Sequence, residues 1–104
     1  MNKSEQMEAF KLFTARQHDI LISKGDDYSG ADRLSNFKTA WAVAWISPEQ
    51  QALSLIATKV ARLWQLLAGK DPKNESVEDS ILDLANYAFL LHCIRAEKSL
   101  QITQ

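Results

Sequence analysis

The chain has 104 residues, 46% of them apolar, and its 12 basic and 13 acidic residues give a formal net charge of −1. This is the length of one ordinary domain, so we expect a single domain over residues 1–104. The balanced charge lacks the basic surface that binds a run of phosphates, and this argues against bulk nucleic acid as a partner.

Neither a disulfide framework nor a membrane segment is expected. Cys93 is the only cysteine, so it has no partner within the chain. No stretch approaches the roughly 20 uninterrupted apolar residues of a membrane span. The N-terminus leads into an amphipathic stretch rather than the apolar core of a signal peptide. We therefore expect a cytoplasmic protein that does not contact membranes.

The aromatic content, with three Trp, four Phe and two Tyr, is high for a chain of this length. A domain this short buries only ~65% of the surface that its unfolded chain exposes. Surplus apolar surface is usually covered by association, so we expect a homo-oligomer.

The first helix is predicted to begin at Ser4 and to run for about 20 residues, because apolar side chains recur there at steps of three and four. Lys24 and Gly25 supply a cation and a left-handed cap that would end this helix. The polar residues 26–33 then form a loop that is long for a helix connection, and long loops in small domains are often functional.

A short second helix is expected to begin near Ser35 or Asn36. The third helix has the clearest start signal in the chain: Ser47 caps it, Pro48 fits its first position, and Gln50 completes a capping box. We expect this helix to run to about Ala68 and to end at Gly69. Its predicted core stripe consists of Leu53, Ile56, Val60, Leu63 and Leu67.

The fourth helix is predicted to be capped by Asn74 and to continue to about Ser99. The sequence contains no alternating strand-like runs, internal repeats or Pro/Gly-rich linkers. The expected fold is therefore all-α, a four-helix bundle-like single domain that is oligomeric.

The fourth helix carries a polar stripe, because four of its polar residues fall within roughly an 80° arc at 100° per residue. The stripe consists of Glu75, Asp79, Asp83 and Asn86. The rest of the helix is apolar nearly all round, which is typical of a buried helix. The stripe should then face the interior or an interface, where carboxylates need partners.

Lys59 and Arg62 on the third helix could provide those partners. An antiparallel pairing of the third and fourth helices would bring Lys59 near Asp83 and Arg62 near Asp79. One interpretation is a structural network of salt bridges that fixes the helix register. The other is a polar pocket in which the two cations hold phosphate oxygens, while the carboxylates orient them or bind Mg²⁺.

Four segments resemble the phage and bacterial nucleotide-modification-associated domain family, over most of the chain from about Lys24 to Leu91. They are Asp27-Tyr28, Asn36-Phe37, Lys59-x-x-Arg62-Leu63 and the run from Glu75 to Ala88, which is the most specific. The arrangement is more distantly similar to the all-α nucleoside triphosphate pyrophosphohydrolases of the MazG type. Those enzymes are helical oligomers that bind Mg²⁺ through Glu-x-x-Glu on one helix and Glu-x-x-Asp on the next.

This chain departs from the hydrolase pattern at the first of these motifs. Lys59-x-x-Arg62 stands where the hydrolases have Glu-x-x-Glu, and Glu75-x-x-x-Asp79 is one residue longer than the second motif. Two cations in place of two carboxylates reverse the local charge and repel a magnesium cluster. The resemblance implies nucleotide binding and leaves hydrolysis open.

Three hypotheses follow for the function. In the first, the chain binds a nucleotide or related phosphorylated molecule, and weak pyrophosphohydrolase activity is left open. The ligand-binding residues would be Lys59, Arg62, Asp79, Asp83, Asn86, Asp27, Tyr28 and Asn36, and a Mg²⁺ ion would use Glu75, Asp79 and Asp83. In the second, a phage-type oligomer sequesters a nucleotide signal without turnover. In the third, the chain is a structural or interaction module.

The remaining candidates have ordinary structural explanations beside the functional ones. Tyr28 could stack on a base or anchor the loop, and Asp27 could bind a metal or a ribose hydroxyl or merely stabilise a turn. Asn36 is expected to cap the second helix, with a ligand contact as the alternative. The three tryptophans, Trp41, Trp45 and Trp64, are expected in the core or an interface rather than around a cofactor.

Overall fold

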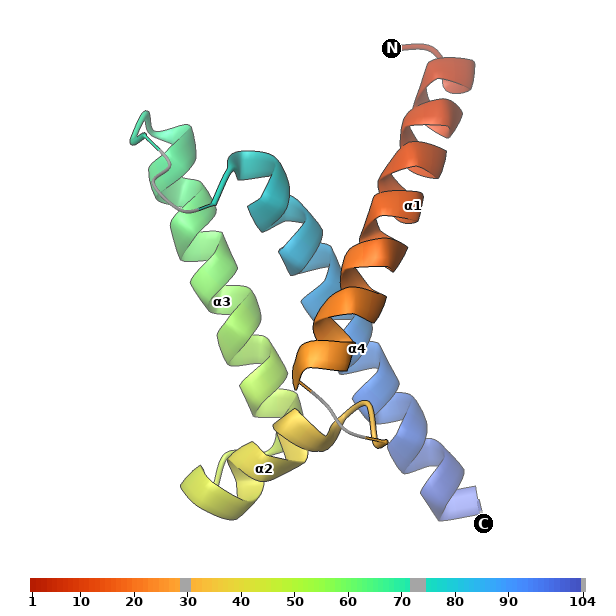
Figure 1. Cartoon of the computed structure of the whole chain (residues 1–104), viewed down its shortest axis with the longest axis vertical. Helices are drawn as coiled ribbons and strands as arrows, with labels where there is room; N and C mark the ends of the chain where they lie inside the picture. Colours follow the sequence, from red (N-terminus) through yellow and green to blue (C-terminus); the bar gives the residue numbers. More distant parts are fainter. Residues whose placement is uncertain (29–30, 72–74, 104) are drawn as a thin grey trace.

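The computed structural model describes the backbone of residues 1–28, 31–71 and 75–103, and the side chains of residues 1–27, 31–71 and 75–100. Four helices account for most of this chain: α1 (Lys3–Tyr28), α2 (Ser35–Ala44), α3 (Pro48–Leu67) and α4 (Val77–Thr103). No strand occurs in the described residues. The predicted all-α class is confirmed (Figure 1).

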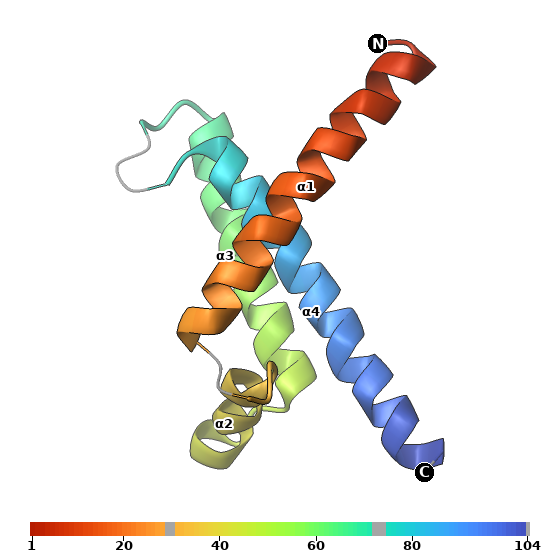
Figure 2. The same ribbon diagram turned by 45° about the vertical axis from the view of Figure 1, so that its right-hand side comes forward.

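The helices form an antiparallel α3–α4 pair, which α1 crosses on the α4 side. Lys59 in the middle of α3 pairs with Asp83 near the start of α4, and Glu49 at the start of α3 pairs with Arg95 near the end of α4. The predicted antiparallel pairing is therefore confirmed. Figures 1 and 2 show α1 crossing α4 at a steep angle, while the short α2 lies across the N-terminal end of α3. The N-terminal half of α1 extends away from the other helices in both views.

The helix starts agree only in part with the sequence prediction. At α1 the cap is Asn2, whose side chain accepts a hydrogen bond from the Glu5 backbone at 2.8 Å, so the prediction that Ser4 caps this helix is wrong. At α3 the predicted capping box is confirmed, with both reciprocal bonds between Ser47 and Gln50 at 3.1 Å.

At α4 the side chain of Ser76 accepts from the backbone N–H of Asp79 at 3.1 Å, and Asp79 accepts from Ser76 in return. Ser76 and Asp79 thus form the box that starts this helix. The predicted cap, Asn74, lies outside the described residues.

The first helix does not end at Gly25 as predicted, but continues to Tyr28. The guanidinium of Arg33 supports this last turn, because it donates to the carbonyl of Ile22 at 3.1 Å and pairs with Asp26 at 2.6 Å. It lies so close to Gly25 that a Cβ there would be 2.0 Å from an Arg33 nitrogen. Glycine is therefore at this position to admit the guanidinium, not to end the helix. The predicted loop over residues 26–33 is correspondingly shorter.

The buried core of the protomer is small. Its buried apolar members are Leu34, Phe37, Ala52, Leu82 and Ile94, and Ser80, Asp83 and Asn86 are buried beside them. The radius of gyration is 15.8 Å, against about 13 Å expected for a compact chain of this length. The protomer is therefore extended and leaves much apolar surface uncovered.

The core stripe predicted for α3 is wrong at three of its five positions, while Ile56 and Leu63 are half-buried. Leu53, Val60 and Leu67 are 58%, 49% and 73% exposed, whereas Ala52 is fully buried and Lys59 points inward. The helical period of the stripe correctly identifies an apolar face of α3. It does not identify which part of the structure covers that face. The inward side of α3 instead carries Lys59, which meets Glu75 and Asp83 of the polar stripe.

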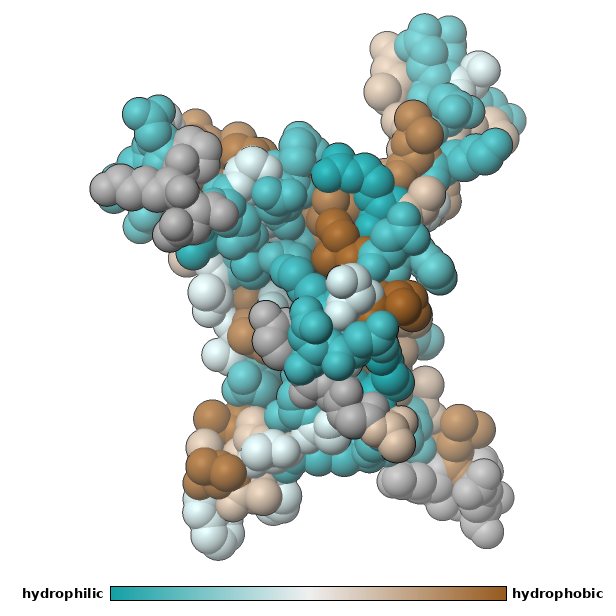
Figure 3. Space-filling view, in the orientation of Figure 1, coloured by the Kyte–Doolittle hydropathy of each residue, from teal (hydrophilic) through white to brown (hydrophobic). Residues whose placement is uncertain are grey.

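Exposed apolar side chains also occur on the other helices. Trp41 and Trp45 pack edge to face, with ring centroids 6.4 Å apart, yet are 55% and 82% exposed, and Trp64 is 79% exposed. Figure 3 shows apolar side chains gathered over the α2 end and along α1. In the described part of the chain, no helix combines the length and apolarity needed to cross a membrane.

Candidate functional site

A cleft of about 1330 Å³ lies between α1, α3 and α4 and is bounded by the segment that leads into α2. Apolar side chains such as Leu21, Phe37, Leu55 and Leu90 line most of it. Charged and amide side chains gather at one end, where the polar stripe of α4 meets α1 and α3. An apolar cleft with a few convergent polar groups is the usual form of a small-molecule site.

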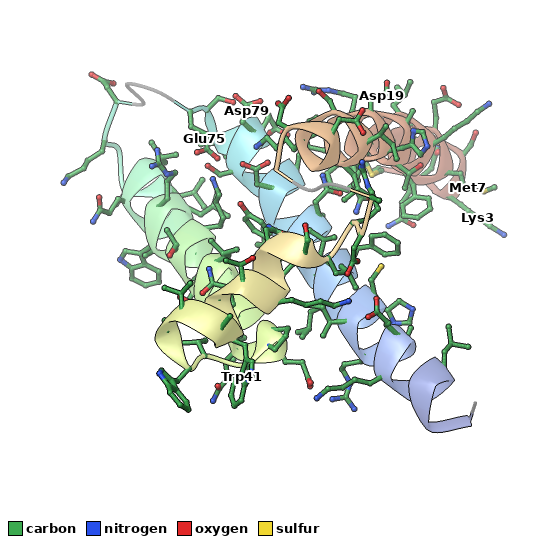
Figure 4. All side chains as sticks on the ribbon, turned by 60° about the horizontal axis from the view of Figure 1, so that its bottom comes forward. Lys3, Met7, Asp19, Trp41, Glu75 and Asp79 are labelled. Atoms are coloured by element: carbon green, nitrogen blue, oxygen red, sulfur yellow. The ribbon has the colours of Figure 1, made fainter. Side chains whose placement is uncertain are left out.

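Lys59 lies at the centre of the polar end. Its ammonium Nζ contacts both oxygens of Glu75, at 2.8 and 3.0 Å, and Oδ2 of Asp83 at 3.0 Å. An ammonium has three N–H donors, so these contacts engage all three. Figure 4 shows Glu75 beside the start of α4, on the side that faces α3. Lys59 thus holds together the two carboxylates of the polar end.

Asp83 joins the third helix of the site. Its other oxygen, Oδ1, accepts from Lys24 of α1 at 2.8 Å. Two lysines from different helices therefore share one carboxylate that is only 7% exposed. The predicted pairing of Lys59 with Asp83 is confirmed, whereas Lys24 was expected only to end the first helix.

The charges in this network stabilise one another. Burial acts to raise the pKa of Asp83, but the hydrogen bonds from Lys24 and Lys59 outweigh it and hold the pKa below its usual range. Burial likewise acts to lower the pKa of Lys59, and the bonds to Glu75 and Asp83 raise it above its usual range. Both groups are consequently charged at neutral pH.

Arg62 and Asp79 do not form the predicted pair. Arg62 lies 3.6 Å from Glu75, is 41% exposed and is not among the residues that line the cleft. Asp79 lines the edge of the cleft but is exposed, and its carboxylate caps the start of α4. Because α4 begins at Val77, Asp79 lies in its first turn and accepts from the Ser76 backbone. Glu75 is therefore the carboxylate that pairs with both Lys59 and Arg62.

Asn86 and Ser80 complete the inward face of α4. Ser80 is fully buried and donates to Glu75 at 3.0 Å. Asn86 is 5% exposed, lines the cleft and donates from Nδ2 to the backbone carbonyl of Gln17 in α1 at 3.2 Å. The polar stripe thus faces the interior at Asp83 and Asn86, as predicted, and turns outward at Asp79.

The residues expected to bind Mg²⁺ do not form a metal site in this structure. In the described part of the chain, no group of three or more His, Cys, Asp or Glu side chains is placed to hold a metal ion. Glu75 and Asp83 do converge, but the Lys59 ammonium lies between them. A cation already occupies the point at which a divalent ion would bridge these carboxylates, so the donor set does not fit the predicted Mg²⁺.

The loop candidates contribute less than expected. Asp27 is in the last turn of α1, exposed and outside the cleft lining, and the side chain of Tyr28 lies outside the described residues. Asn36 lines the cleft, but it lies within the first turn of α2, so the prediction that it caps this helix is wrong. Two further lining residues, Arg33 and Cys93, were not predicted. Burial raises the pKa of the Cys93 thiol.

Comparison with known proteins identifies no relative of this chain. No family model matches the chain, and neither the curated proteins nor the solved structures searched include a match.

Proposed function

We propose that the protein binds a nucleotide or a related phosphorylated small molecule in the cleft between α1, α3 and α4. The observation that carries this proposal is the convergence of Lys24 and Lys59 on Asp83, at the polar end of a cleft whose walls are mostly apolar. A base or other flat ring fits the apolar walls, and a phosphate can accept a hydrogen bond from a lysine ammonium at the polar end.

The charges at the polar end balance. Lys24, Lys59 and Arg62 carry three positive charges, Glu75 and Asp83 carry two negative charges, and all five are linked by contacts of 3.6 Å or less. Arg62 lies outside the cleft lining, and Asp79 adds a negative charge at the edge of the cleft. Support for an anion therefore rests on the half-exposed ammonium of Lys24 and not on an excess of positive charge.

Lys24 is the cation best placed to contact the phosphate. It uses one of its three donors on Asp83, its side chain is 49% exposed and it lines the cleft, so further donors are accessible to a ligand. Lys59 has all its donors engaged and is only 14% exposed. Lys59 therefore positions Asp83 and Glu75, while Lys24 supplies the direct contact, with Arg33 beside it in the cleft lining.

Binding without turnover is the form of this proposal that the site favours. The charge reversal at Lys59 and Arg62 removes the metal ligands on which a pyrophosphohydrolase of the MazG type depends. A sequestering oligomer requires only the cleft and the uncovered apolar surface described above.

The experiment is a binding titration with matched variants. Thermal shift and isothermal titration calorimetry would use nucleoside mono-, di- and triphosphates and cyclic dinucleotides, in EDTA and in Mg²⁺. Lys24→Met should weaken the tightest binder about 10-fold or more, because a charge-assisted hydrogen bond contributes about 1.5–3 kcal/mol. The control is Lys11→Met, an exposed lysine of the same helix outside the cleft.

The outcomes separate the three hypotheses. Recovery of unchanged ligand after denaturation supports sequestration, and release of pyrophosphate supports hydrolysis. If no nucleotide binds, or if Lys24→Met and Lys11→Met bind equally well, the proposal is wrong and the charges form only a structural network.

A further inference from the structure

The side chain of Asn86 has one polar atom without a partner. In the part of the chain that the structure describes, Oδ1 of Asn86 is the only buried side-chain nitrogen or oxygen that makes no hydrogen bond. The residue itself is 5% exposed and lines the cleft. Buried acceptors without a donor are rare, and each calls for an explanation such as a bound water, ion or ligand.

The orientation of the amide is fixed by its other end. Nδ2 donates to the backbone carbonyl of Gln17 at 3.2 Å, and a flipped amide would place an oxygen against that carbonyl. Oδ1 is therefore an acceptor, and its missing partner must be an N–H or O–H donor.

The neighbouring donors are engaged elsewhere. Lys59 uses its three donors on Glu75 and Asp83, and Ser80 donates to Glu75. Lys24, the other lysine that lines the cleft, is bound to Oδ1 of Asp83. No described side chain of the site donates to Oδ1 of Asn86, so an occupant of the cleft can supply the donor.

We infer that Asn86 accepts a hydrogen bond from a sugar hydroxyl of the ligand, next to the phosphate that Lys24 contacts. This inference rests on the proposed function. Asn86 follows Asp83 by three residues on α4, and this corresponds to roughly 4.5 Å along the helix at 1.5 Å per residue. A ribose hydroxyl is only a few bonds from a 5′-phosphate, whereas the amino groups of a base lie on the far side of the ring.

The arrangement gives the cleft a defined polarity. The phosphate lies at Lys24, the sugar lies against Asn86, and the base extends toward the apolar walls near Phe37 and Leu55. The class of ligand selected is one with a free hydroxyl on the sugar. Dideoxynucleotides are the natural negative probes.

The test is a double-mutant cycle between protein and ligand. The probes are the four common ribonucleoside 5′-monophosphates and their 2′,3′-dideoxy counterparts, titrated calorimetrically against wild type and Asn86→Leu. Wild type should bind the dideoxy probes about 10-fold more weakly than the ribonucleotides, because the buried acceptor is then left without a donor. Asn86→Leu should bind both series equally weakly, and Gln65→Leu, which alters an exposed amide of α3, should behave as wild type.

Each other result has a distinct meaning. Equal binding of the two series by wild type overturns the inference but leaves nucleotide binding intact, and it identifies Asn86 as bound to water only. A hydroxyl preference that persists in Asn86→Leu also overturns it. Absence of binding by every probe overturns this inference, and with the di-, tri- and cyclic nucleotides also silent it removes the proposed function. Asn86→Ala also removes the acceptor, should likewise abolish the preference, and serves if Asn86→Leu does not fold.

Discussion

The ammonium of Lys59 in α3 lies 3.0 Å from the carboxylate of Asp83 in α4, and the same ammonium contacts Glu75. Asp83 in turn contacts Lys24 of α1. This one pair therefore connects the three helices that form the cleft. A buried carboxylate and a nearly buried ammonium are each costly alone, so the crossing of α1 over the α3–α4 pair depends on their being together.

Replacing Lys59 with Met should destabilise the fold by about 3–5 kcal/mol, because it leaves Glu75 and Asp83 facing each other without their shared cation. Urea unfolding followed by circular dichroism measures this change. The control is Arg62→Met on the next turn, which is 41% exposed and should lose less than about 1 kcal/mol. Equal effects of the two variants would contradict the network described here.

The Lys59–Asp83 pair was predictable from the sequence, but its surroundings were not. Helical periodicity placed Asp83 on the polar side of α4, and a short connection implied an antiparallel partner. The same reasoning assigned Arg62 to Asp79. It failed there because Asp79 serves as the cap of its own helix, and a cap depends on where the helix begins, which sequence fixes only to within a few residues.

Lys24 was missed because its contact with Asp83 spans 59 residues of sequence. No local pattern reveals such a contact. The only signal would have been the position of Lys24 on the same face of α1 as Gln17 and Leu21, which lie seven and three residues earlier, since that face turns toward α4. The apolar stripe of α3 shows a second limit of sequence analysis. Its period identifies an apolar face, but such a face is equally consistent with a core and with an interface.

Acid should weaken the fold through Asp83 only below about pH 4. The folded pKa of Asp83 is lowered from 3.8, so its stabilising contribution is complete above that value and is lost as the pH falls through the lower folded value. Lys59 has a pKa raised from 10.5, so its contribution is lost only in strong alkali. The free energy of unfolding contributed by this pair should be flat from pH 5 to pH 9. Unfolding free energies of wild type and Asp83→Asn test this prediction, because their difference should stay constant from pH 5 to pH 9 and shrink below about pH 4. A difference that changes near neutral pH, or one that does not shrink in acid, would contradict it.

Magnesium should leave the ligand-free protein unchanged. The Lys59 ammonium already lies between Glu75 and Asp83, so a divalent ion gains no site there and would be repelled by that ammonium. The melting temperature in EDTA should equal that in millimolar Mg²⁺. Stabilisation by Mg²⁺ that vanishes in Asp83→Asn would show that the carboxylates do bind metal, and would favour the hydrolase hypothesis.

The exposed face of α3 should mediate self-association. Leu53, Val60, Trp64 and Leu67 recur along one side of this helix and are 49–79% exposed in the protomer. Contiguous apolar surface of this kind is uncommon on monomers. Size-exclusion chromatography with light scattering should show an oligomer for wild type and a smaller species for Trp64→Glu. Gln65→Glu adds the same charge to the adjacent exposed residue and should leave the oligomer intact. A wild-type monomer at micromolar concentration would refute this prediction.

Gly25 provides a test of why α1 continues to Tyr28. In an unhindered helix, replacing glycine with alanine stabilises by about 1 kcal/mol, because alanine loses less backbone entropy on folding. At Gly25 the new Cβ would meet the Arg33 guanidinium at 2.0 Å, so the guanidinium must move away from Asp26 and the Ile22 carbonyl. Gly25→Ala should therefore yield little or no stabilisation in wild type, but close to the full 1 kcal/mol in an Arg33→Ala background. Unfolding free energies of the four proteins complete this cycle. The same gain in both backgrounds would mean that Arg33 does not constrain Gly25, and the continuation of the helix would then need another cause.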